Sequence, residues 1–226
     1  MYKKKTDNIL TGLFTVIIGI CFLMIIKDIV SYRLAETEYR EIKKDYTYPD
    51  QETAEDDQAE EKEQSSLSSD QTYFNRLYDI NSDLVAVLSI PSIDLVYPVV
   101  QGNDNEEYLR RTFEGKQNPA GCLFMDYEND SGFADDNTYI YGHNMKDGSM
   151  FGGLKKMTGK DFDGTDVKAY ITTKDGTSTF RFDKAEVVDI LNYHAPEDKK
   201  GALTLYTCWA NDKSRRLLVT FIREAS

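Results

Sequence analysis

An uncharged apolar run near the N-terminus constrains this chain more than any other feature of its sequence. The 18 residues 9–26, ILTGLFTVIIGICFLMII, contain no Asp, Glu, Lys or Arg. At ~1.5 Å per helical residue, this is about the minimum length that crosses a hydrocarbon core ~30 Å thick. The run therefore predicts a membrane-spanning helix, which we place at residues 9–30, after a short N-terminal segment of residues 1–8.

The charges that flank this run predict the orientation of the helix. Lys3, Lys4 and Lys5 precede it, whereas Lys27 and Asp28 balance each other on the far side. The positive-inside rule then places residues 1–8 in the cytoplasm and exports the rest of the chain. A cleaved signal peptide is the alternative, but its apolar region is shorter, ~7–15 residues, and no small-x-small cleavage site follows residue 26. A buried core helix is disfavoured because nothing in the run is suited to face water.

A strongly acidic stretch follows the apolar run. Residues 36–71 contain 13 acidic and four basic residues, a net charge of −9 out of −12 for the whole chain. Few of its side chains are large and apolar, so burial cannot offset the entropy of ordering it. We expect residues 31–71 to be a solvated linker, of which residues 31–45 extend the membrane helix as an amphipathic stalk and residues 46–71 form a self-repelling spacer. Neither part is expected to contribute to the core.

Residues 72–226 have the composition of one globular domain. A helix is expected around residues 73–78, and another near residues 148–157. Between and after them the sequence shows short β-rich runs separated by Pro, Gly, Asn and Asp, a pattern typical of an antiparallel sandwich or barrel. The runs are 84–90, 95–100, 122–125, 138–141, 167–172, 179–182, 185–190, 203–207 and 216–222.

The charge and the cysteine content exclude several classes of function. With 27 Lys and Arg against 39 Asp and Glu, the chain has no excess of positive charge with which to bind nucleic acid. The three cysteines, at positions 21, 122 and 208, are too few for a disulfide framework and form no CxxC pair. We therefore expect neither a metal nor another cofactor, and any cysteine chemistry must use a single thiol.

Three residues form a plausible catalytic group. Cys208 ends the run 203–207, and a polar turn leads into the next run, so a hairpin brings Arg216 back beside it. His143 follows a glycine at the end of the run 138–141, where an imidazole can project over a barrel mouth. A thiolate attacks, a histidine protonates a leaving amine, and a guanidinium stabilises an oxyanion or holds a substrate carbonyl.

The remaining histidine and cysteines are assigned structural roles. His194 precedes Ala195-Pro196 in a predicted loop and is read as a surface residue. Cys122 lies within an apolar strand and is read as a small buried hydrophobe, and Cys21 lies in the apolar run.

The segment Thr204-Leu205-Tyr206-Thr207-Cys208 resembles the TLxTC motif of the sortases, membrane-anchored cysteine transpeptidases of Gram-positive bacteria. The resemblance implies that Cys208 is the nucleophile, His143 the acid/base partner and Arg216 the oxyanion or substrate anchor. Arg216 is preferred to Arg215 because the apolar strand starts directly after it. The implied fold is a closed sortase-type β-barrel of about eight strands with a few short helices, preceded by the transmembrane helix.

Further motifs resemble class B sortases in particular. They are Tyr97-Pro98-Val99-Val100-Gln101, Asp104-Asn105, Tyr108-Leu109, Gly121 with Phe124-Met125-Asp126, Tyr141-Gly142-His143-Asn144-Met145 and Ser149-Met150-Phe151. The sequence departs from that class in two places. Tyr206 stands where class B members usually have serine. The connection near residues 191–202 is short, whereas class B members generally carry a long helix-containing insertion that helps to wall the substrate groove.

The resemblance implies that the domain 72–226 lies outside the cell and cleaves the C-terminal sorting signal of secreted proteins. A thioester on Cys208 would pass the protein to an amine of peptidoglycan or its precursor. Two other functions stay open at this stage: a hydrolytic cell-wall cysteine peptidase, and a non-catalytic membrane-tethered adhesion or scaffold module. The peptidase type normally places its Cys at a helix N-terminus with the His downstream, whereas here the His comes first.

Overall fold

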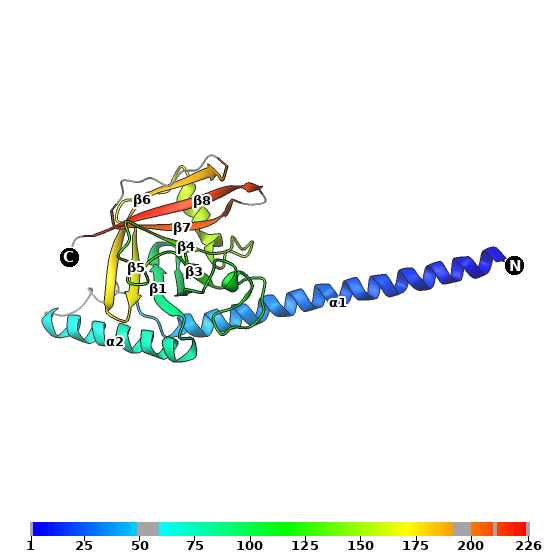
Figure 1. The fold of residues 1–226 in the computed structure, drawn as a ribbon, viewed down its shortest axis with the longest axis horizontal. Coiled ribbons are helices and arrows are strands. Elements are labelled where there is room, and N and C mark those ends of the chain that lie inside the picture. Colours follow the sequence, from blue (N-terminus) through cyan, green and yellow to red (C-terminus); the bar gives the residue numbers. More distant parts are fainter. Residues whose placement is uncertain (1, 49–58, 192–199, 210–211, 225–226) are drawn as a thin grey trace.

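The described part of the chain forms a closed β-barrel with one long helix leaving it (Figure 1). In this computed structural model, the described residues are 2–48, 59–191, 200–209 and 212–224. The barrel order is β1-β2-β3-β4-β7-β8-β6-β5. The predicted closed barrel of about eight strands is therefore confirmed.

Two α-helices and eight strands make up the described fold. The helices are α1 (Tyr2–Lys44) and α2 (Ala59–Ile80). The strands are β1 (Leu84–Ile90), β2 (Leu95–Val100), β3 (Leu123–Met125), β4 (Asn137–Tyr141), β5 (Lys168–Thr173), β6 (Gly176–Asp189), β7 (Ala202–Trp209) and β8 (Asp212–Arg223). Three 3₁₀ segments, η2 (Pro91–Ile93), η3 (Glu107–Arg110) and η4 (Phe151–Thr158), lie in the connections.

Most strands lie where the sequence predicts them, with two differences. The runs 179–182 and 185–190 form the single strand β6, whose pairing with β8 shifts register between Phe182 and Lys184. The barrel is mostly antiparallel, but β2 pairs with β3 and β4 pairs with β7 in parallel. The helix expected near residues 148–157 is η4, a 3₁₀ segment with four buried residues.

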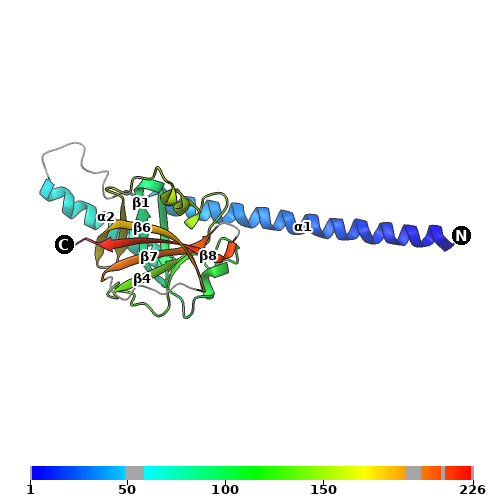
Figure 2. The ribbon, with the colours of Figure 1, turned by 90° about the horizontal axis from the view of Figure 1, so that it is seen from above.

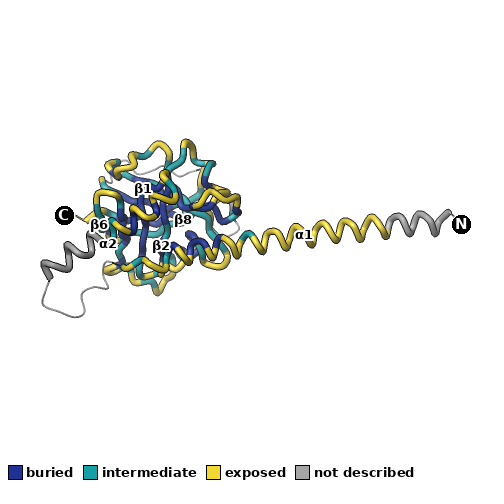
Figure 3. The backbone as a smooth tube through the Cα atoms, turned by 90° about the horizontal axis from the view of Figure 1, so that it is seen from below, coloured by how far each residue is buried: buried dark blue, intermediate teal, exposed yellow. Residues whose placement is uncertain are grey.

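The acidic segment after the apolar run is not simply a solvated linker. Ala35, Tyr39 and Ile42 of α1 are only 3%, 6% and 7% exposed and belong to the same core cluster as the barrel strands. These positions follow one another at i, i+4 and i+7, which places them on one face of the helix. In Figure 3, the described part of α1 is mostly exposed until this face meets the barrel. The expectation of a linker without core residues is therefore wrong for this part.

The helix α2 also begins earlier than expected. The sequence predicts a helix near residues 73–78 after a spacer, whereas α2 already starts at Ala59. Its last turns bury Tyr73, Phe74 and Leu77 against the barrel. The Tyr73 hydroxyl donates a 2.6 Å hydrogen bond to the carbonyl of Ile42, which joins the end of α2 to the end of α1.

The apolar part of α1 has the properties of a candidate membrane span. The helical segment Thr11–Lys44 contains an 18-residue window with a mean hydropathy of 2.5, and none of that window is buried in the structure. Its length and composition suffice to cross a bilayer. Figures 1 and 2 show this part of the helix extending well away from the barrel.

The end of β4 needs a glycine because of close packing. A Cβ atom on Gly142 would lie 2.4 Å from Cδ2 of Leu123 and 2.7 Å from Cδ2 of Phe151. Both neighbours are fully buried, so neither side chain has room to move away. Glycine therefore lets the segment after β4 cross β3 and η4 at short range.

Truncation tests whether α1 is part of the folded domain. We expect a fragment of residues 27–226 to unfold at nearly the temperature of the full chain. For a fragment of residues 72–226, the free energy of unfolding should be lower by on the order of 3–5 kcal/mol, because the fragment lacks the side chains that α1 buries. Thermal and urea unfolding, followed by circular dichroism, measure both. Equal stability of the two fragments would show that α1 contributes nothing to the core.

Substitution of Gly142 tests the close packing at the end of β4. We expect Gly142→Ala to destabilise the fold by about 1–3 kcal/mol, because the added methyl group overpacks the contact with Leu123 and Phe151. Gly153→Ala is the matched control, since its Cβ would lie at ordinary distances of 3.7 and 3.8 Å from its neighbours. Urea unfolding compares the two, and similar losses in both variants would contradict the packing argument.

Candidate active site

Cys208 lies near the end of β7 with its side chain exposed. The β7–β8 hairpin places Arg216 directly opposite Cys208 in the antiparallel register. The pairing shifts between Cys208 and Trp209, so Cys208 is the last residue of the regular ladder. The sequence predicted this hairpin and this neighbour correctly.

His143 reaches the same end of the barrel from β4. Tyr141 pairs with Tyr206 in the parallel β4–β7 ladder, so His143 and Cys208 each lie two residues beyond one register pair. Three hydrogen bonds hold the two segments together. Gly142 N donates to Tyr206 O at 3.2 Å, Thr207 Oγ1 donates to Gly142 O at 2.7 Å, and Asn144 Nδ2 donates to Cys208 O at 2.7 Å.

One hydrogen bond to the backbone orients the imidazole of His143. Its Nε2 lies 2.8 Å from the carbonyl oxygen of Leu109, in η3. A carbonyl can only accept a hydrogen bond, so Nε2 carries a proton in this arrangement. The hydrogen-bond geometry thus assigns the Nε2–H tautomer, and Nδ1 is the nitrogen available to exchange a proton.

Aromatic side chains pack beneath Arg216. Its guanidinium lies 5.9 Å from the ring centroid of Tyr206, which packs edge-to-face on Tyr141 at 5.1 Å. The Tyr141 hydroxyl in turn donates a 2.6 Å hydrogen bond to Asp126. Burial raises the pKa of Tyr206, and the nearby guanidinium of Arg216 partly opposes that rise. Tyr206, the residue that departs from the class B pattern, is thus the aromatic contact of Arg216.

The other two cysteines are in different environments. Cys122 is 1% exposed, and burial raises the pKa of its thiol to about 12. Its sulfur lies 3.7 Å from the carbonyl of Pro98. The prediction of a buried structural cysteine is therefore confirmed, while Cys21 lies exposed on α1. Among the described residues, no group of three or more His, Cys, Asp or Glu side chains could hold a metal ion.

Two of the predictions concern residues that lie partly or wholly outside the described ranges. His194 lies in the segment 192–199, and so does most of the short connection between β6 and β7.

Sequence reasoning missed two groups at this site. Asn144 follows His143 directly, and its amide ties the histidine segment to the Cys208 carbonyl. Its position beside the histidine was the available signal. The Leu109 carbonyl gave no such signal, because a backbone acceptor is common to every residue type.

Known proteins share both sequence and fold with this chain. A family model described as the sortase domain matches residues 88–222. Sortase B of Listeria monocytogenes serovar 1/2a (strain ATCC BAA-679 / EGD-e) is 46% identical over 86 residues, which are 38% of this chain and 35% of that protein. Sortase B of Staphylococcus aureus (strain NCTC 8325 / PS 47) is 31% identical over 144 residues, 62% of this chain and 56% of that protein. The matched parts thus span about a third and just over half of these relatives.

Solved structures share the fold. A mutant form of Clostridium perfringens sortase B has a TM-score of 0.64 at 22% identity, covering 73% of this chain and 92% of that one. Staphylococcus aureus sortase B has a TM-score of 0.62 at 24% identity, covering 74% and 95%. A Bacillus anthracis sortase B in complex with AAEK2 has a TM-score of 0.58 at 25% identity, covering 76% and 100%. With a family model that matches more than half of its residues and relatives named sortase B, the chain belongs to the sortase family and resembles its class B members.

Proposed function

We propose that this protein is a cysteine transpeptidase in which Cys208 is the nucleophile, His143 the acid/base and Arg216 the oxyanion or substrate anchor. The observation that carries the proposal is the convergence of β4, β7 and β8 on one end of the barrel. Cys208 and Arg216 are direct register partners, and His143 is tied to the Cys208 segment by hydrogen bonds. Family membership supports the same reaction class.

The first half of the reaction cleaves a peptide bond. The Cys208 thiolate attacks the scissile carbonyl carbon and forms a C–S bond, while the carbonyl oxygen becomes an oxyanion. The Arg216 guanidinium cannot deprotonate near neutral pH, so it can stabilise that charge throughout. When the C–N bond breaks, Nδ1 of the His143 imidazolium gives its proton to the leaving amine. The products are a thioester on Cys208 and the released C-terminal fragment.

The second half transfers the bound protein to a new amine. His143, now neutral, removes a proton from the incoming amine as its nitrogen attacks the thioester carbonyl. The C–S bond breaks, a new amide forms, and the thiolate and imidazolium are restored. Water can replace the amine, in which case the outcome is hydrolysis.

Family membership also supports a proposal for the substrates and the location. We propose that the substrates are secreted proteins with a C-terminal sorting signal and that the acceptor is an amine of peptidoglycan or its precursor. The apolar part of α1 anchors the protein in the cell membrane, with residues 1–8 in the cytoplasm and the barrel outside. Lys3, Lys4 and Lys5 support this orientation.

Substitutions at the three residues test the catalytic assignment. The probe is a fluorogenic peptide library that copies C-terminal sorting signals, assayed with and without a panel of primary amines. We expect Cys208→Ala and His143→Ala to lose more than 99% of cleavage. Arg216→Lys should lose about a hundredfold, because an ammonium cannot reproduce the planar donors of the guanidinium.

Arg215→Lys is the matched control for Arg216→Lys. Arg215 pairs with exposed Asp212 at 2.9 Å, so its replacement should change the rate by less than about twofold. A His143→Ala variant with near-normal activity would remove His143 from the mechanism. Cleavage without any transfer to an amine would favour a hydrolytic peptidase, and an inert Cys208 a scaffold module.

The accessibility of Cys208 tests the proposed location. On intact protoplasts, a membrane-impermeant maleimide should label Cys208 as fully as after permeabilisation, because its side chain is exposed whereas Cys122 is buried. The Cys208→Ala variant supplies the background. Labelling that requires permeabilisation would reverse the orientation, and a soluble secreted form with a new N-terminus near residue 30 would favour a cleaved signal peptide.

A further inference from the structure

We propose that Glu38 and Tyr39 of α1 are positioning residues for His143, acting through the connection between η3 and β3. This connection, residues 111–122, follows the Leu109 carbonyl that holds the imidazole and returns the chain to the barrel. The inference rests on the proposed acid/base role of His143. It gives a part in catalysis to a helix that contains none of the three catalytic residues.

Tyr39 joins two points of the connection with one hydroxyl group. It donates a 2.6 Å hydrogen bond to the carbonyl of Gly121 and accepts one of 3.2 Å from the backbone N–H of Phe113. The side chain is buried, and burial raises the pKa of this hydroxyl well above its usual value. Tyr39 therefore stays neutral and keeps both hydrogen bonds.

Gly121 links the Tyr39 hydroxyl to the Leu109 carbonyl, which accepts the hydrogen bond from His143. A Cβ atom on Gly121 would lie 2.8 Å from the carbonyl oxygens of both Tyr108 and Leu109, so the backbone at Gly121 presses closely on them. Its φ of +63° is in the left-handed region that favours glycine. The Cys122 N–H, one residue on, donates to the Tyr108 carbonyl at 3.1 Å. A shift of Gly121 towards η3 would therefore press on the Leu109 carbonyl.

Glu38 fixes the other half of the connection. Its carboxylate accepts hydrogen bonds of 3.0 Å from the Thr112 hydroxyl and 3.0 Å from the Glu114 N–H, and Lys116 Nζ lies 3.6 Å away. The side chain is only 4% exposed, so these contacts replace its hydration. A buried carboxylate is retained at such a position only when it is well paired.

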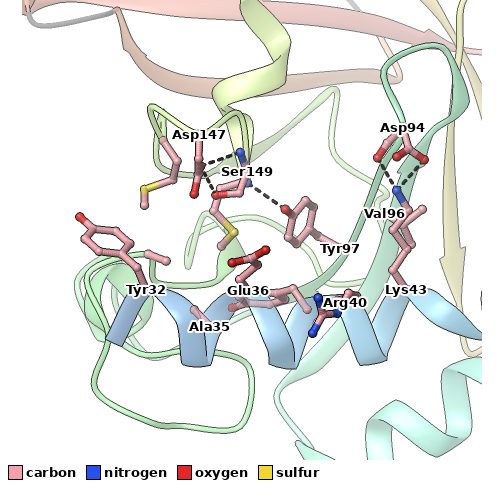
Figure 4. A pocket seen from close by; sticks show the side chains of 14 residues that line it. Tyr32, Ala35, Glu36, Arg40, Lys43, Asp94, Val96, Tyr97, Asp147 and Ser149 are labelled. Carbon is pink, nitrogen blue, oxygen red and sulfur yellow. Dashed lines mark hydrogen bonds and ion pairs between the residues drawn. The ribbon is translucent and has the colours of Figure 1, made fainter. Parts of the chain in front are cut away.

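The same helix also borders the segment that follows His143. A cleft of about 190 Å³ separates α1 from the residues 145–150 (Figure 4). On its inner wall the Tyr97 hydroxyl accepts a 3.0 Å hydrogen bond from the Met150 N–H. Tyr39 packs edge-to-face on Tyr97 at 5.2 Å. Tyr39 thus contacts both the connection that follows Leu109 and the Tyr97 ring, whose hydroxyl bonds to the segment after His143.

The test compares single hydroxyl removals in the full-length chain in detergent. Tyr39→Phe keeps the ring and removes both hydrogen bonds. We expect about a tenfold loss of kcat with KM within about twofold, because the imidazole is less well held while the peptide groove is intact. The activity probe is the library peptide that the wild-type protein cleaves fastest.

A spectroscopic measurement reads the position of His143 without any substrate. Long-range ¹H–¹⁵N spectra report which imidazole nitrogen carries the proton, and a His194→Gln background leaves His143 as the sole histidine. We expect a single Nε2–H tautomer in that background and a mixture of tautomers once Tyr39→Phe is added. Glu38→Ala should act in the same direction, and Glu38→Gln should restore most of the activity because its amide oxygen can still accept from Glu114 N–H.

Tyr46→Phe is the matched control. Its hydroxyl also bonds to the barrel, to Ser89 Oγ at 2.8 Å, but within the described part of the chain it makes no hydrogen bond to the connection. Tyr46→Phe should lower the free energy of unfolding about as much as Tyr39→Phe does. It should leave kcat and the His143 tautomer unchanged. The proposal is overturned if Tyr39→Phe and Glu38→Ala keep the wild-type kcat and single tautomer, or if they lose activity with the His143 spectrum unchanged. A Cys208→Ala variant that still cleaves would instead overturn the proposed function, and the tautomer comparison would still decide the role of α1.

Discussion

The candidate site depends on the parallel pairing of β4 with β7. A parallel pair cannot be closed by a tight turn, so a long connection must separate the two strands. Here that connection contains η4, β5 and β6, and β5 and β6 join β1 and β8 to close the barrel. His143 and Cys208 therefore become neighbours through a pairing of segments that lie far apart in the chain. Arg216, by contrast, needs only the local β7–β8 hairpin.

The sequence predicted correctly those features of the fold that depend on residues close together in the chain, such as strand bounds and hairpins. The bounds of β1 and β2 agree with the apolar runs 84–90 and 95–100, because Pro91 and Asp94 interrupt the pattern where η2 turns the chain. The sequence also predicted that Arg216 lies beside Cys208, because a single hairpin joins the two strands that contain them. The parallel β4–β7 pair was not predicted, since nothing near either strand specifies a partner some 60 residues away.

The prediction failed for α1 because it averaged charge over a long segment. The net charge of −9 over residues 36–71 comes from residues 45–71, whereas residues 36–44 of α1 have three acidic and three basic side chains. The average conceals Tyr39 and Ile42 on the buried face of α1, and it treats Glu38 as one more solvated acid. In the structure Glu38 is buried and satisfied by Thr112 and Glu114, partners more than 70 positions away in the chain. Burial of an acid can be predicted only when its hydrogen-bond donors are known.

The direction in which α1 leaves the barrel sets how far a substrate must extend. The end of β7 and the start of β8 lie at the end of the barrel from which α1 departs (Figures 1 and 2). Ala35, the first buried position, lies nine positions along continuous helix from residue 26, the end of the apolar run, a rise of roughly 14 Å at ~1.5 Å per residue. An extended peptide covers that distance in about four or five residues. A polypeptide held at the level of residue 26 would thus need only a short spacer to bring a scissile bond to the height at which the barrel begins.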